Sequence, residues 1–66
     1  MAKETIEGYV ARDISEDLYV FDYKPHRTDG IFFPCGDTAL RLDKSLFPEI
    51  NYKNSPVKVK LTIETV

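Results

Sequence analysis

The chain has one cysteine and one histidine, the side chains that most often act as a nucleophile and its base. Cys35 and His26 are nine positions apart, with Asp29 and Asp37 nearby in the sequence. A catalytic thiol needs a neighbouring cation that lowers its pKa and a cleft that excludes water. A chain of 66 residues leaves little volume for such a cleft. We therefore expect no enzyme, and we interpret Cys35 as a turn residue and His26 as a solvated loop residue.

The sequence also lacks the residues of a metal or nucleotide site. A structural zinc site takes four cysteine or histidine ligands, and the chain holds two such residues in total. Asp13, Glu16 and Asp17 do not follow the alternating spacing of a calcium loop. The three glycines are far apart, so there is no glycine-rich phosphate loop. We expect no metal and no cofactor.

One segment concentrates side chains suited to binding, with aromatic residues alternating along a strand and basic residues at its end. The candidate binding residues are Tyr19, Phe21, Tyr23, Lys24, His26 and Arg27. Tyrosine and arginine are enriched at the hot spots of protein interfaces. Rings that stack on bases, beside cations that meet phosphates, would instead suit single-stranded nucleic acid. A third interpretation is that the rings fill the core and the cations form a solvated rim.

The charge balance separates the two binding interpretations. Nine basic residues face eleven acidic ones, which gives a net charge of −2. A nucleic-acid module would gather its cations, whereas most of these are scattered among acids. We expect a protein-binding module, with a foreign partner or a second copy that completes the thin core. A weak single-stranded nucleic-acid-binding barrel is the alternative.

Alternation of apolar and polar residues at period two predicts that strands position these side chains. Residues 5–12 place Ile6, Gly8 and Val10 on one face. Residues 18–24 have apolar side chains on both faces, which predicts a central strand. Residues 57–66 alternate most regularly and predict the last strand.

Shorter elements are expected between these strands. Residues 5–12 and 18–24 predict a first hairpin, joined by the polar turn at residues 13–17. Residues 31–33 and 38–42 predict a second hairpin, and residues 25–30 predict a loop because they begin with proline and end in a turn signal. Asp43 can cap a single helical turn at residues 44–47.

Together these elements predict one all-β domain over residues 1–66. It is a small five-stranded antiparallel meander, barrel-like, with one short helical turn before the last strand. Closure is expected because an open sheet would expose its edges. Adjacent first and last strands would set Glu4 and Glu7 near Lys58 and Lys60, in exposed pairs that choose the register.

The location of the protein follows from what the sequence lacks. A lone cysteine cannot form an internal disulfide bond. No stretch approaches the roughly 18 apolar residues of a membrane span, and the first residues lack the apolar core of a signal peptide. We expect a cytoplasmic protein that does not bind membranes.

Several motifs form one pattern over most of the chain. They are Gly8-Tyr9-Val10-Ala11-Arg12-Asp13, Leu18-Tyr19-Val20-Phe21, Lys24-Pro25 with Arg27, Gly36-Asp37, Ser45-Leu46-Phe47-Pro48 and Val57-Lys58-Val59. The pattern resembles a family of short proteins encoded by gut anaerobes, their phages and mobile elements. The resemblance implies an accessory protein of a mobile element, and it transfers no activity and no site.

A second, partial resemblance is to SH3 domains. The motifs are Phe21-Asp22-Tyr23, similar to the end of the ALYDY motif, Ile31-Phe32-Phe33 with Gly36-Asp37, and Leu46-Phe47-Pro48. The segment for the tryptophan-bearing hairpin is missing, and the chain has no tryptophan. The resemblance implies a small barrel in which Tyr23 is similar to a groove tyrosine for a polyproline ligand.

Overall fold

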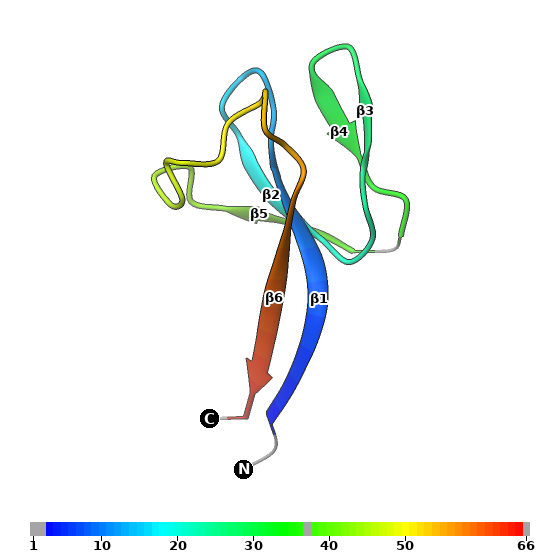
Figure 1. Ribbon diagram of the computed structural model, residues 1–66, viewed down its shortest axis with the longest axis vertical. Helices are drawn as coiled ribbons and strands as arrows, with labels where there is room; N and C mark the ends of the chain where they lie inside the picture. The colour runs from blue at the N-terminus through cyan, green and yellow to red at the C-terminus, as the bar shows by residue number, and fades with distance from the viewer. Residues whose placement is uncertain (1–2, 37, 66) are drawn as a thin grey trace.

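The computed structural model describes residues 3–36 and 38–65, which form six strands joined by turns (Figure 1). The strands are β1 (Lys3–Arg12), β2 (Leu18–Phe21), β3 (His26–Thr28), β4 (Ile31–Phe33), β5 (Ala39–Leu42) and β6 (Val57–Glu64). A four-stranded antiparallel sheet has the order β5-β2-β1-β6, and β3 and β4 form a two-stranded sheet. The all-β prediction is confirmed, but the predicted five-stranded meander is wrong, because the described residues form six strands in two sheets. The described residues contain no helix long and apolar enough to cross a membrane.

The long strand β1 organises the larger sheet. It pairs with β6 from Lys3 opposite Glu64 to Val10 opposite Val57. Only residues 9–12 of β1 also pair with β2. The outer half of β1 and β6 therefore extends from the body of the protein as a two-stranded ribbon (Figure 1).

This pairing confirms the predicted contact between the first and last strands, with one correction. Glu7 lies opposite Lys60 and forms an ion pair with Lys58 at 3.1 Å. The hydrogen bond to Glu7, together with the charge of Glu7, raises the pKa of the Lys58 ammonium. Glu4 lies opposite Ile63 on the other face of the sheet, so its predicted position near the lysines is wrong.

Both faces of the sheet carry core residues where β2 joins it. One cluster consists of Val10, Leu18, Val20 and Ile50. The other consists of Ala11, Phe21 and Phe32. Successive residues of β2 point to opposite faces, so this strand contributes to both clusters. The prediction of a central strand is therefore confirmed for residues 18–21, whereas residues 22–24, also predicted as strand, lie beyond its end.

The second hairpin differs from the prediction. Residues 26–28 form strand β3 and pair with β4, while β5 pairs with β2. The turn between β3 and β4 is Asp29-Gly30, with φ angles of 50° and 84°. Two central residues with positive φ match the right-handed twist of hairpin strands, so Asp-Gly favours this tight turn. The predicted loop at 25–30 and the predicted pairing of residues 31–33 with 38–42 are wrong.

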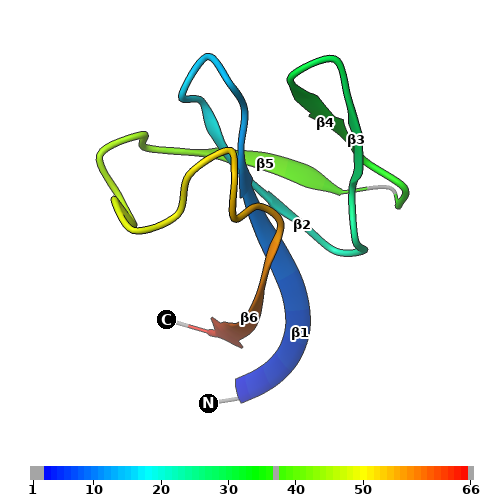
Figure 2. The same ribbon diagram turned by 45° about the horizontal axis from the view of Figure 1, so that its top comes forward.

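Contacts from the turn after β1 hold this hairpin against the sheet. The Phe32 N–H donates to the Asp13 carboxylate at 3.1 Å, and the Ile14 N–H donates to the Gly30 carbonyl at 2.9 Å. Figure 2 shows β3 and β4 beside this turn. These bonds join segments that are distant in the sequence, which is why local patterns do not reveal the pairing.

Gly30→Ala is expected to lower the free energy of unfolding by about 1–2 kcal/mol, because Gly30 has φ 84° and an alanine Cβ is disfavoured there. The added Cβ would also lie 2.7 Å from Cγ2 of Ile14. Urea denaturation followed by circular dichroism measures the loss. Asp29→Gly is the control, since glycine keeps the left-handed φ of 50°. An alanine variant as stable as this control would contradict the prediction.

The sheet does not close into a barrel, and the structure shows no helical turn at residues 44–47. No Cα atom of β5 lies within 8 Å of a Cα atom of β6 in the described part of the chain. Asp43 accepts hydrogen bonds from the N–H and hydroxyl of Ser45, as a capping residue does. Phe47, however, has φ 50°, which ends helical geometry.

Candidate functional site

An open apolar groove lies on the face of the sheet opposite the β3–β4 hairpin. It consists of two adjoining cavities of about 410 and 360 Å³ that share Val20 and Leu61. One is lined by Val10, Val20, Leu42, Leu46, Phe47, Val59, Lys60 and Leu61. The other is lined by Ile6, Val20, Phe21, Asp22, Thr38, Leu40, Leu61 and Ile63. We call this combined surface the sheet groove.

The sheet groove exists because β5 and β6 stay apart. Side chains of β1 and β2 form its floor, and those of the two edge strands stand at its sides. Leu40 is 59% exposed and Ile63 is 58% exposed, although strand alternation places both on the apolar face. Contiguous exposed apolar side chains of this kind mark interaction sites on soluble proteins.

Phe47 stands at one end of the sheet groove in a strained backbone conformation. Its φ is 50°, and its side chain is 47% exposed. The Phe47 carbonyl accepts hydrogen bonds from Nη2 of Arg12 at 3.2 Å and from the Ile50 N–H at 2.9 Å. Such strain persists where surrounding bonds impose it, and it is concentrated at functional sites. Because the Phe47 ring is only half-buried, its packing does not fully compensate for the cost of this backbone conformation.

Arg12 holds the segment that carries Phe47. This side chain is 8% exposed, and its Nε donates to the Ile50 carbonyl at 2.6 Å. Its terminal nitrogens donate, at 2.9–3.2 Å, to the carbonyls of Glu16, Lys44, Leu46 and Phe47. A guanidinium has five N–H groups, and here it makes five hydrogen bonds to backbone oxygens. Arg12 is therefore a positioning residue for one end of the sheet groove.

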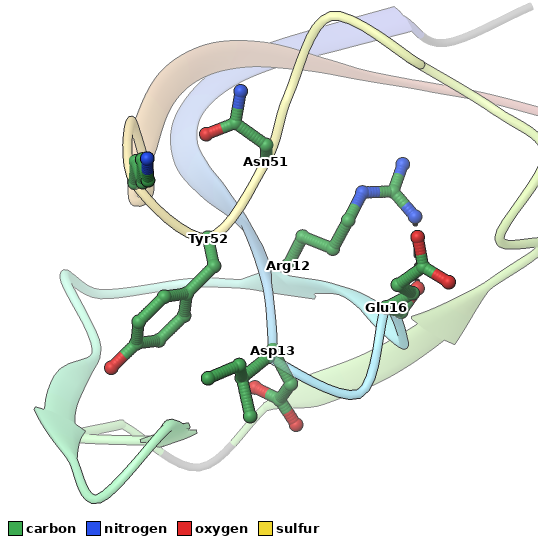
Figure 3. Close-up of a pocket in the computed structure, with 7 residues that line it drawn as sticks. Arg12, Asp13, Glu16, Asn51 and Tyr52 are labelled. Carbon is green, nitrogen blue, oxygen red and sulfur yellow. Dashed lines mark hydrogen bonds between the residues drawn. The ribbon is translucent and has the colours of Figure 1, made fainter.

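A second depression, of about 490 Å³, lies at the end of the sheet beside Arg12 (Figure 3). Asp13, Asn51 and Tyr52 line it. Burial raises the pKa of the Asp13 carboxyl, and the hydrogen bond from the Phe32 N–H opposes this effect. Since the Asp13 carboxylate and the Arg12 guanidinium already bind backbone groups, we interpret this depression as structural.

The structure separates the binding residues predicted from the sequence. Phe21 is 2% exposed and belongs to the core, and the ring of Tyr19, half-buried, lies 6.2 Å from that of Phe21. Tyr23 follows β2 and is 64% exposed. The exposed basic residues are Lys24, His26 and Arg27. The six residues thus do not form one continuous surface.

Arg27 makes a contact within the protein. Its guanidinium carbon lies 5.1 Å from the centre of the Tyr52 ring, and that ring meets Phe32 edge-on at 5.9 Å. An exposed cation over an aromatic ring contributes about 0.5–1 kcal/mol. This part of the predicted surface therefore also helps to hold residues 51–53 against the hairpin.

The groups considered for catalysis and metal binding lie apart from the sheet groove. Cys35 and His26 are exposed, and Asp37 lies outside the described residues. In the described ranges, no three His, Cys, Asp or Glu side chains group together as metal ligands would.

Strand alternation alone does not reveal the sheet groove, although the sequence contains one signal at Arg12. Arg12 is an even number of residues from Ile6, Gly8 and Val10 in the same strand, so alternation alone directs its side chain toward the apolar face. A cation at such a position needs buried acceptors, which is a reason to expect a positioning role.

The fold and the groove define a small all-β protein whose four-stranded sheet, in the residues that the structure describes, has unpaired outer edges at β5 and β6 and an exposed apolar face. Comparison with protein-family models, curated proteins and solved structures finds no match to the chain.

Proposed function

We propose that this chain is a non-enzymatic protein-binding module that accepts an apolar segment of a partner protein in the sheet groove. The observation that carries the proposal is the exposure of Leu40, Phe47 and Ile63 on one concave face. Together the cavities are as large as the sites that bury small ligands or a few side chains.

The chemistry of the groove supports a protein partner. Its lining is aliphatic and aromatic, and the polar members Asp22, Thr38 and Lys60 are few. An apolar centre with a polar rim is the usual composition of a protein interface. Phosphate recognition would need several cations in the groove, whereas Lys60 is the one basic residue among its described lining residues.

Two predictions from the sequence remain beside this proposal. Single-stranded nucleic acid is the alternative ligand, and the exposed Tyr23 beside Lys24 and His26 is the feature that favours it. The resemblance to short proteins of mobile elements suggests an accessory role and assigns no activity.

Photo-crosslinking tests the proposed groove. With photoreactive benzoylphenylalanine in place of Leu40, illumination of cells is expected to give covalent adducts with another protein. The matched control places the same group at Arg41, whose side chain points to the opposite face because neighbouring strand residues alternate. Adducts of equal yield from both positions, or from neither, would contradict the proposal.

Phe47→Gly separates binding from stability in the same assay. Glycine accepts φ 50° without strain, so the free energy of unfolding should stay within about 1 kcal/mol of the parent. Loss of the ring should lower the adduct yield from position 40 at least tenfold. An unchanged yield in a folded variant would remove Phe47 from the proposed site.

A further inference from the structure

The outer edge of β6 has no partner strand in the described part of the chain. β6 is the last strand in the order β5-β2-β1-β6, and it is eight residues long. Its outer half pairs only with the outer half of β1, where β2 no longer reaches. A two-stranded ribbon is marginally stable by itself, and an open edge is a template for another strand.

We propose that β6 pairs antiparallel with β6 of a second copy, about a twofold axis at Leu61. The two four-stranded sheets then form one continuous eight-stranded sheet. The proposed pairing uses the edge of β6, whose Val59, Leu61 and Ile63 also line the sheet groove. It requires no ligand in that groove.

Strand alternation limits the register of this pairing. Directly opposed residues of two antiparallel strands lie on the same face of the sheet. The apolar residues of β6 must therefore lie opposite apolar residues of the partner's β6, so that the joined sheet keeps one apolar face. An axis at Lys60 satisfies this condition but sets two lysines against each other. An axis at Leu61 opposes Leu61 to itself and Val59 to Ile63 of the partner subunit. Ile63, 58% exposed in the single chain, would then gain an apolar neighbour.

Charge complementarity favours the same axis. It places Lys58 opposite Glu64 of the partner subunit, and symmetry repeats this pair. Within the chain, Lys3 pairs with Glu64 at 3.6 Å and Glu7 pairs with Lys58 at 3.1 Å. Charges of alternating sign would therefore form one row across the joined sheets. In order, they belong to Lys3, Glu64, the partner's Lys58 and the partner's Glu7. An axis at Thr62 opposes Lys60 to Glu64 but pairs a shorter part of β6.

Sedimentation over a range of concentrations gives the first test. A dimer that forms with increasing concentration is expected, and it should weaken in high salt because the charge row is exposed. Glu64→Lys sets like charges against Lys58 of the partner subunit and should weaken the dimer at least tenfold. Lys58→Glu combined with Glu64→Lys should recover part of this loss, because it restores the opposite charges across the interface but sets like charges beside Lys3 and Glu7 within each chain. A monomer at all concentrations, or a dimer unaffected by Glu64→Lys, would overturn the proposal.

Disulfide formation then tests the register. In a Cys35→Ser background, Leu61→Cys places the new cysteine opposite its own copy, where Cα separations of about 4.5–5.5 Å suit a disulfide bond. Lys60→Cys and Thr62→Cys are the controls, because each meets itself only in a shifted register. Rapid oxidation of the Leu61→Cys dimer, at least tenfold faster than the controls, supports the axis. Faster oxidation of either control overturns it. Phe47→Gly should leave dimerisation unchanged, which separates this result from the groove test.

Discussion

Arg12→Ala is expected to lower the free energy of unfolding by about 3–5 kcal/mol, which is close to the whole stability of a domain of this size. The guanidinium donates all five of its hydrogen bonds to backbone carbonyls of two loops. Without the guanidinium, the buried Ile50 carbonyl loses this donor. The segment that places the Ile50 side chain in the core is then no longer held. Urea denaturation followed by circular dichroism measures the loss.

Two further substitutions identify the cause of this loss. Arg12→Met keeps much of the apolar stem but has no donor, and Arg12→Lys keeps the charge with three donors in a different geometry. Both variants should recover less than half of the stability lost in Arg12→Ala, because neither side chain can donate hydrogen bonds to five carbonyls. A methionine variant as stable as the parent would show that packing of the stem, and not hydrogen bonding, is what Arg12 supplies.

The dependence on Arg12 links stability to the sheet groove. The same side chain that binds the Ile50 carbonyl also binds the carbonyls of Leu46 and Phe47. Any substitution that breaks the hydrogen bonds of Arg12 should therefore also free Leu46 and Phe47 at the end of the sheet groove. For this reason the groove is tested at Leu40 and Phe47, whose side chains stand at its rim and are not in the core.

The strands with regular alternation were predicted from the sequence, and the elements fixed by distant contacts were not. Residues 5–12 and most of 57–66 lie in β1 and β6, with the expected faces. The sequence does not reveal β3, because Pro25 favours a loop although the N–H groups after it can still pair. The partner of β4 depends on Asp13, whose hydrogen bond to Phe32 spans 19 residues.

The sheet groove exists only because β5 and β6 are far apart, and strand alternation does not determine that separation. The same apolar pattern of β5 and β6 fits a closed barrel or an open groove, and the choice depends on how far apart the edges lie. In the structure they stay apart, so Leu40 and Ile63 are exposed. For Tyr19, Phe21 and Tyr23 the sequence left both a binding surface and a core role open, because strand position alone does not show which ring another element covers.

Phe21→Ala is expected to lower the free energy of unfolding by about 3–5 kcal/mol, the usual cost of removing a buried phenylalanine ring. Phe21 is 2% exposed and packs with Ala11 and Phe32, so the substitution opens a cavity between the sheet and the hairpin. Thermal unfolding followed by circular dichroism measures the loss. Phe21→Leu, which refills part of the cavity, should recover much of it.

Tyr23→Ala is the matched control, because this ring lies two residues further along the chain and is 64% exposed. Its removal should change stability by less than about 0.5 kcal/mol. If Tyr23→Ala proved as destabilising as Phe21→Ala, the assignment of one ring to the core and the other to the surface would be wrong. The expected contrast leaves the Tyr23 ring available to a ligand and gives the Phe21 ring a structural role, although Phe21 also lines one side of the sheet groove.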